Sequence, residues 1–180
     1  WPELSSDCRL MNKLLRDLTD YSMSDQLTKQ RSDLCNLLRR AYLSCLPLTE
    51  GTNKTLTYTS RVSCAYMPLD SPKMMEALLN LIVNALDAIS DNGNVQIILT
   101  KSNEQFVVSI IDDGCGIAPK QLLTIFHPFT TTKPDGTGLG LPVAKRIIEG
   151  HGGHIRVSSA PNQGATFTFL LPCSFSSDKK

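Results

Sequence analysis

The sequence lacks several features that would assign it to a specialised class of protein. It has no apolar run long enough to span a membrane, and it does not start with the charged and then apolar pattern of a secretion signal. Its 18 basic and 17 acidic residues nearly cancel, which argues against a polycation that works on nucleic acid. We therefore expect this chain to contact neither membrane nor nucleic acid.

Cysteine and histidine are also too sparse for two common kinds of scaffold. The six cysteines are few for a disulfide framework of this length, and none stands in a C-x-x-C pair. His127, His151 and His154 are the only three histidines, and none has zinc-finger spacing. We expect free buried thiols in a reducing cytoplasm and no zinc site.

What is present is the composition of a globular domain. Of the 180 residues 41% are hydrophobic, enough for one domain with about thirty residues to spare. Because the segments do not alternate regularly, their order favours an α+β fold, a two-layer α/β sandwich, over a parallel sheet. Apolar periodicity predicts helices over 4–23, 32–45, 71–90 and 139–149, and strands over 54–60, 95–100, 106–111, 155–158 and 166–171.

The helix expected over 71–90 carries a polar stripe. Asn80, Asn84 and Asp87 are spaced so that they share one face. Asparagine carbonyl oxygens can ligate Mg²⁺, an ion that prefers oxygen. A solvated polar face is the alternative for this stripe taken alone. Asp70 or Ser71 would cap the helix, and its apolar face would consist of Met75, Leu78, Ile82, Ala85, Leu86 and Ile89.

Two glycine-rich segments could approach a flat or an anionic ligand closely. The segment 112–117 (DDGCGI) follows an apolar strand, where a carboxylate can accept a hydrogen bond from an exocyclic amine; a common Asp-Gly turn is the alternative. The segment 136–141 (GTGLGL) runs into a helix, whose N-terminus favours phosphate. It matches neither the dinucleotide-binding pattern nor a Walker motif.

The segment 125–133 (IFHPFTTTK) lies between the two glycine-rich segments. Its two phenylalanines could pin a loop to the body of the domain, and its three hydroxyls and Lys133 could reach phosphate oxygens. An ordinary loop with a small hydrophobic anchor is the alternative.

The fixed order of these four segments is more specific than any one of them. In this order they resemble the N box, first glycine box, F box and second glycine box of the catalytic ATP-binding domain of sensor histidine kinases. That domain belongs to the GHKL superfamily of gyrase, heat-shock chaperone, histidine kinase and mismatch-repair ATPases. The segment 164–168 (GATFT) resembles the last glycine box. The resemblance covers about residues 28–172 and implies the Bergerat fold, with ATP and Mg²⁺ as cofactors.

The resemblance implies a role for each matching residue. Asp112 corresponds to the aspartate that binds the adenine amino group, and Thr166 to a residue that supports adenine through water. Asn84 corresponds to the magnesium ligand, with Asn80 beside the phosphates as a second candidate metal residue. The other positions expected in the ATP site are Asp87, Ala88, Gly114, Gly116, Ile117, Thr131, Thr132, Lys133, Gly136, Thr137, Gly138, Leu139 and Gly140.

One position favours a kinase over an ATPase. The gyrase-like ATPases carry a glutamate, the general base for water, four residues before the magnesium asparagine, where this chain has Asn80. Glu76 lies one turn further back, too far to replace that base. Many kinases carry an arginine near Thr131, so here we expect Lys133 to stabilise charge and, with Asn84, to form the catalytic pair. The segment 131–141 resembles the nitrogen-regulator type of sensor kinase.

Residues 1–27 resemble the second helix of the dimerisation and phosphoacceptor hairpin, followed by a hinge. Two such hairpins form a four-helix bundle, so the full-length protein is expected to be a homodimer. The ATP-binding domain would occupy 28–174, and a polar tail 175–180.

No histidine of the chain stands in the family's phosphoacceptor motif. His127 lies in the F box, and His151 and His154 flank a glycine turn, where local hydrogen bonding explains them. We therefore expect the phosphate donor to act on a histidine helix elsewhere in the full-length kinase, which then serves a response regulator. Its location would be cytoplasmic, including the cytoplasmic part of a membrane-anchored sensor.

Three alternatives stay open at this point. A GHKL-type ATPase would turn over ATP steadily, and a degenerate kinase-like scaffold would not bind nucleotide. A serine kinase of the anti-sigma type shares the nucleotide site but lacks the preceding bundle helix.

Overall fold

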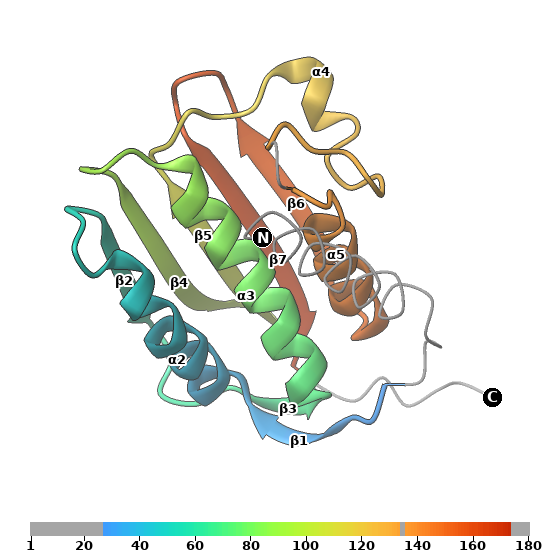
Figure 1. Cartoon of the computed structure of the whole chain (residues 1–180). Coiled ribbons are helices and arrows are strands. Elements are labelled where there is room, and N and C mark those ends of the chain that lie inside the picture. The colour runs from blue at the N-terminus through green and yellow to red at the C-terminus, as the bar shows by residue number, and fades with distance from the viewer. Residues whose placement is uncertain (1–26, 134–135, 174–180) are drawn as a thin grey trace, which may run out of the picture.

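The computed structural model describes residues 27–133 and 136–173, in which helices cover one face of a mixed sheet (Figure 1). The helix expected at 4–23 and the polar tail lie outside these residues, so the domain boundaries remain predictions. The elements follow in the order β1 (Gln30–Asp33), α2 (Leu34–Cys45), η1 (Leu46–Thr49), β2 (Thr55–Ser60), β3 (Tyr66–Leu69), α3 (Ser71–Ala88), β4 (Asn94–Ser102), β5 (Gln105–Asp112), α4 (Pro119–Leu122), α5 (Gly140–Gly150), β6 (His154–Ser159) and β7 (Ala165–Pro172).

The main sheet has the strand order β2-β4-β5-β7-β6. Its pairs are antiparallel except that β2 joins β4 in parallel at one edge. The short strands β1 and β3, which the sequence analysis missed, pair with each other outside this sheet. The expected α+β fold with two layers is confirmed, and β4 and β5 form an antiparallel hairpin.

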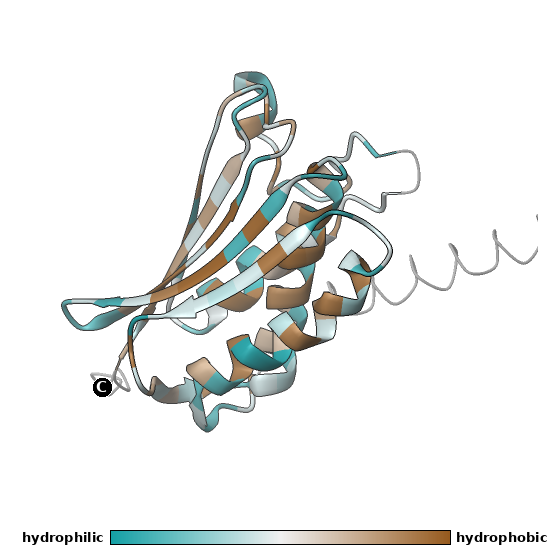
Figure 2. Ribbon diagram, turned by 90° about the vertical axis from the view of Figure 1, so that its left-hand side faces the viewer, coloured by the Kyte–Doolittle hydropathy of each residue, from teal (hydrophilic) through white to brown (hydrophobic). Residues whose placement is uncertain are grey.

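The alternation of side chains along β5 places hydrophobic residues in the core and the carboxylate of Asp112 at the end of the core. On β5, Phe106, Val108 and Ile110 point to the helices and are buried, and Ile110 pairs with buried Phe167 of β7. Asp112, the last residue of β5, continues the same inward face and is 5% exposed. Figure 2 shows the helices packed against this side of the sheet, with hydrophobic residues in both layers.

The helix α3 runs through the middle of the helical layer. Asp70 caps it as expected, since its carboxylate accepts the N–H of Lys73 over 3.1 Å. Met75 is partly buried and packs against the core, in agreement with its place on the expected apolar face. The buried set is wider than that face because α3 packs against α2 and α5 as well as against the sheet. The buried residues are Met74, Ala77, Leu78, Leu81, Ile82, Ala85 and Leu86.

The described cysteines are free, but only Cys45 is buried. Cys64 and Cys115, which lie in segments that connect helices and strands, are exposed, and Cys35 and Cys173 are intermediate. The expectation of buried thiols was therefore wrong for most of them. Among the described residues, no helix has both the length and the apolar character needed to cross a membrane.

His151 links the C-terminal end of α5 to the N-terminal end of α3. Its Nδ1 lies 2.7 Å from the carbonyl oxygen of Ile147, the local contact that was expected. Its Nε2 also accepts the N–H of Asp70 over 2.9 Å, across 81 positions of sequence. Since Nε2 is the acceptor, Nδ1 carries the proton and donates to Ile147.

Candidate functional site

Three polar residues line the half of α3 that ends near the glycine-rich loops. Asn80 and Asn84 are partly buried, and Asp87 is exposed. Gly140, the first residue of α5, lies directly beside Asn80: a Cβ added there would stand 3.4 Å from the Asn80 amide oxygen. Asn80 therefore faces the start of α5, which a merely solvated polar face would not explain.

Asp112 is held at the end of the core by main-chain donors. Its Oδ1 accepts the N–H of Gly114 over 3.0 Å and that of Ala165 over 3.2 Å. Burial raises the pKa of the Asp112 carboxyl, while these two hydrogen bonds lower it and Asp113 raises it again. In the part of the chain that the structure describes, no hydrogen bond within the protein uses its Oδ2. One carboxylate oxygen is thus anchored, and the other remains for a ligand.

The loop that follows Asp112 is fastened to the end of α3. The N–H of Cys115 donates to the carbonyl oxygen of Ala88 over 3.1 Å. Gly114 passes so close that a Cβ there would clash with the same carbonyl, which explains why glycine is needed at this position. Ala88, expected in the ATP site, therefore contributes its main-chain carbonyl, which holds this loop against α3.

The other side of this loop is tied to the turn between β6 and β7. Ser159, which the sequence analysis missed, accepts the N–H of Ile117 over 2.8 Å and donates to Gly164 over 2.6 Å. Ser159 carried no sequence signal beyond its place at a strand end. The main chain of Ala165 was missed for the same reason, since side-chain motifs do not record backbone donors.

Thr166 is not brought to the site. Its partner in β5 is Ile111, whereas Ala165 pairs with Asp112. Successive side chains of a strand point to opposite faces, so Thr166 lies on the face of the sheet away from Asp112. The expectation that Thr166 supports adenine was therefore wrong.

The loop between α4 and α5 is anchored to the body of the domain through Phe126 and braced by a hydrogen bond between two of its own residues. The ring of Phe126 contacts Phe167 edge to face at 6.4 Å, and the Lys145 ammonium lies 5.4 Å from the Phe126 ring centre. Phe129 was expected to anchor the loop too, but its side chain is 61% exposed. Its N–H instead bonds the carbonyl of Gly138 over 3.0 Å, where positive φ and contact with Phe129 both demand glycine.

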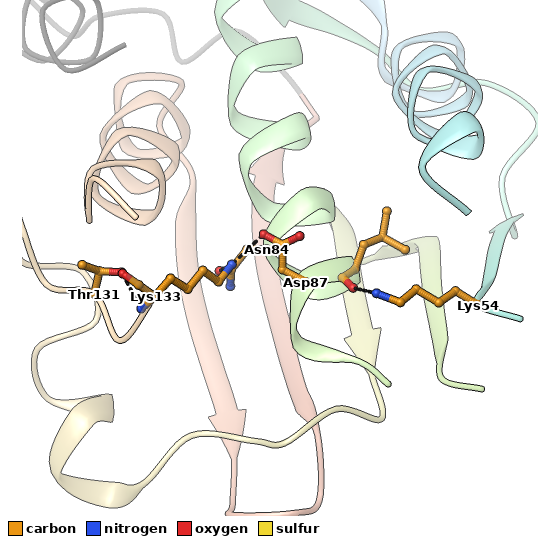
Figure 3. A network of polar contacts seen from close by, with 6 residues as sticks. Lys54, Asn84, Asp87, Thr131 and Lys133 are labelled. Carbon is orange, nitrogen blue, oxygen red and sulfur yellow. Dashed lines mark hydrogen bonds and ion pairs between the residues drawn. The ribbon is translucent and has the colours of Figure 1, made fainter. Parts of the chain in front are cut away.

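Lys133 extends from this loop to α3 (Figure 3). Its Nζ donates to Asp87 Oδ2 over 2.8 Å and to Asn84 Oδ1 over 3.2 Å. Thr131 Oγ1 accepts the Lys133 N–H over 3.1 Å and shapes this bend. Thr132 is exposed. The structure thus joins the expected lysine to two expected residues of α3, which sequence spacing alone could not show.

The start of α5 offers main-chain donors for an anion. Leu139 occupies the N-cap, and no side chain caps the helix. Thr137 Oγ1 accepts the N–H of Leu139 over 3.4 Å, one position before the helix. Uncapped N–H groups and the helix dipole both favour a phosphate at this end. Gly136 lies on the approach to it, against Thr131.

The donor set fits a metal ion shared with phosphate rather than a protein cage. Within the described residues, no three carboxylate, histidine or cysteine side chains gather around one point. Mg²⁺ often takes only one or two protein ligands and completes its shell with phosphate oxygens and water. The Asn84 amide oxygen, which here accepts a lysine ammonium, is suited to such a cation.

Comparison with known proteins identifies the family. The model for histidine kinase-, DNA gyrase B- and HSP90-like ATPases matches residues 69–174, and the chain belongs to this family. It is 33% identical over 170 residues to the sensor histidine kinase ZraS of Salmonella typhimurium, which is 94% of this chain and 37% of ZraS. It is 37% identical over 165 residues to the signal transduction histidine-protein kinase AtoS of Escherichia coli, 90% of this chain and 27% of AtoS. The chain thus spans about a third of the length of these curated relatives.

Solved structures confirm the fold. The catalytic domain of histidine kinase ThkA superposes with a TM-score of 0.74 at 29% identity, over 81% of this chain and 96% of that domain. Full-length ShkA, solved in complex with AMPPNP, gives 0.82 at 26% identity, over 93% of this chain and 36% of ShkA. The chain is therefore homologous to the catalytic ATP-binding domains of sensor histidine kinases.

Proposed function

We propose that this chain is the ATP-binding catalytic part of a sensor histidine kinase. It holds Mg-ATP and passes the γ-phosphoryl group to a histidine outside this chain. In that step the bond from the γ-phosphorus to the β,γ-bridging oxygen breaks, a bond to an imidazole nitrogen forms, ADP leaves and the imidazole releases its proton. Positioning and charge neutralisation supply most of the catalysis in such transfers.

The adenine end of the proposed site consists of Asp112 and the segment 114–117. The anchored carboxylate offers its second oxygen to the exocyclic amine of adenine, and the loop lies close to α3 because glycine permits it. Gly116 lies against the carbonyl of Ala160, and Ile117 packs against the core, so both residues hold this segment in place. An amine donor facing a fixed carboxylate distinguishes adenine from guanine, which carries a carbonyl there.

The phosphate end consists of Asn80, Asn84, Asp87, Lys133 and the start of α5. Asn84 would hold Mg²⁺, which neutralises phosphate charge when bound. Lys133 would leave Asp87 and Asn84 for the γ-phosphate, because a divalent ion and an ammonium compete for the same amide oxygen. The uncapped start of α5 would receive the remaining phosphate oxygens.

The amide at position 80, where the ATPases carry a carboxylate as general base, carries the choice of kinase over ATPase. The position one turn before Asn84 is Asn80, whose amide lies beside Gly140 and cannot accept a proton as a carboxylate does. The carboxylate of Glu76 is engaged with Lys73, at 3.0 Å. Slow hydrolysis would preserve ATP until an acceptor arrives.

Two measurements test this function. The chain should bind a fluorescent ATP analogue in Mg²⁺, and it should transfer labelled phosphate, acid-labile as phosphohistidine is, to a hairpin fragment of a related kinase that carries the acceptor. Steady ATP turnover without the fragment, near typical enzyme rates, would identify an ATPase instead. Failure to bind the analogue would indicate a scaffold.

The partners proposed for the whole protein follow from its relatives. They are the phosphoacceptor helix of the same full-length kinase, a second copy in a homodimer, and a response regulator. A solved structure of ThkA contains its response regulator TrrA, which shows such a complex for ThkA. For this chain we propose a location in the cytoplasm, as part of a longer sensor.

A further inference from the structure

The C-terminal turn of α3 is held by groups that lie outside the helix. α3 ends at Ala88, and Ile89 is extended, with φ −88° and ψ 151°, so the last carbonyls need partners from elsewhere. The Cys115 N–H donates to Ala88 on one side. On the other, the ammonium of Lys54 donates to the carbonyl oxygen of Leu86 over 2.9 Å.

Lys54 approaches α3 from the side opposite to Lys133 (Figure 3). It directly precedes the edge strand β2 and is 32 positions away from Leu86 in sequence. The next residue, Thr55, donates its N–H to the carbonyl of Gly93 over 2.9 Å. Lys54 and Thr55 therefore bond, respectively, the last turn of α3 and the connection that follows it.

The connection from α3 to β4 is fixed from the other direction as well. Asp113 Oδ1 accepts the N–H of Asn94 over 2.8 Å, and the Asp113 N–H donates to the carbonyl oxygen of Asn94 over 3.3 Å. The turn that carries Asn84 and Asp87 is thus held from two sides, by Lys54 and by the loop at Cys115. Of these two contacts, the one from Lys54 depends on a side-chain cation.

We propose that Lys54 is a positioning residue for the phosphate end of the site. Its ammonium complements the carbonyl end of the helix dipole and holds the turn from which Asn84 and Asp87 project. This inference rests on the function proposed for that site. Lys54 lies outside the segment 69–174 that the family model matches, and it acts on main chain, so no side-chain motif marks it.

The test compares two substitutions with a matched control on the same helix. Lys54→Met keeps the aliphatic stem and loses the donor, whereas Lys54→Arg keeps both charge and donor. Lys73→Met is the control, because Lys73 lies in the first turn of α3 and pairs with Glu76 at 3.0 Å. The affinity of each variant for a fluorescent ATP analogue is measured in Mg²⁺ and in EDTA.

We expect Lys54→Met to reduce the gain in affinity from Mg²⁺ about fivefold and to change the affinity in EDTA less than about twofold. Electrostatics alone would act in the opposite direction, since removing a positive charge near a cation site strengthens cation binding. Lys54→Arg and Lys73→Met should retain the wild-type gain. An unchanged gain in Lys54→Met, or the same loss in Lys73→Met, would overturn the proposal.

Amide hydrogen exchange provides a second measurement that needs no nucleotide. The amides of 86–89 should exchange about fivefold faster in Lys54→Met than in the wild type, and at the wild-type rate in Lys73→Met. If the wild-type chain did not bind the analogue, the proposed function would fail while exchange still tested the contact from Lys54. Unchanged exchange in Lys54→Met would overturn the role of Lys54 by itself.

Discussion

The adenine end and the phosphate end of the proposed site are built from different kinds of contact. At the adenine end, Asp112 is buried and two backbone N–H groups fix its carboxylate. At the phosphate end, Lys133 meets Asp87 with side chains that are 43% and 52% exposed. Exposed ion pairs contribute only about 0–1 kcal/mol, so this contact exchanges easily.

The difference corresponds to two separate tasks. A base is recognised best by groups that are already in place, because no ordering then opposes binding. Phosphoryl transfer instead needs a cation that can move from the protein to the phosphate. Both tasks share α3, whose end touches the adenine loop at Ala88 and carries Asn84 one turn earlier. Because different contacts hold the two ends, changes in the side chains of one end should alter mainly the task of that end.

The largest effect should come from Asp112→Asn. The amide would present a donor to the adenine amine and leave it without an acceptor, so affinity should fall about a hundredfold, with and without Mg²⁺. Asp113→Asn is the matched control, since Asp113 is the adjacent carboxylate and is exposed. Titration of a fluorescent ATP analogue measures both. An equal loss in the two variants would remove the special role of Asp112.

Lys133→Ala should affect transfer far more than binding. Phosphotransfer to the hairpin fragment should slow about thirtyfold, because the positive charge acts on the transition state. The affinity for ADP should change less than about twofold. Single-turnover transfer and ADP titration give the two numbers. Equal losses in both would mean that Lys133 contributes only to ground-state binding.

Asn84→Ala should remove the metal dependence without disturbing adenine. The affinity in Mg²⁺ should fall about tenfold to the level measured in EDTA, since the amide oxygen proposed to hold the metal is gone. The affinity in EDTA serves as the internal control for the adenine end. Retained Mg²⁺ dependence would assign the metal to another residue.

The smallest effect concerns His151, which joins the C-terminal end of α5 to the N-terminal cap of α3. Burial lowers the pKa of His151 from its ordinary 6.5, so the unfolded chain accepts a proton that the folded chain resists. Stability should be complete above about pH 6.5 and fall as pH drops through that value, by at most about 1.4 kcal/mol per unit. Urea unfolding from pH 7.5 to 5.5 measures this slope.

Two variants identify the group responsible for that slope. His151→Phe should be less stable at neutral pH, because it leaves the Asp70 N–H without its acceptor, and its stability should depend less on pH. His154→Gln, at an exposed position, should retain the wild-type slope. A wild-type slope in His151→Phe would place the titration elsewhere.

Local signals were sufficient for the order of the main elements and for the motif residues. Helical periodicity predicted α2, α3 and α5, and the cap at Asp70 is encoded by residues that follow it directly. Asp112 stood out as a carboxylate at the end of a strand, and its role was implied by the resemblance of the four segments, in their fixed order, to a known family. Such features depend on neighbours within a few positions, which a sequence displays.

Only the tertiary structure decided which distant groups meet. Strand register put Thr166 on the face of the sheet away from Asp112, and it placed the N–H of Ala165 in contact with the Asp112 carboxylate. The contact of Lys133 with α3 and that of Lys54 with Leu86 join positions 46 and 32 residues apart. Neither periodicity nor a motif records such pairs, because they arise from packing of the whole chain. The sequence alone determined the chemistry available, and packing determined which groups act together.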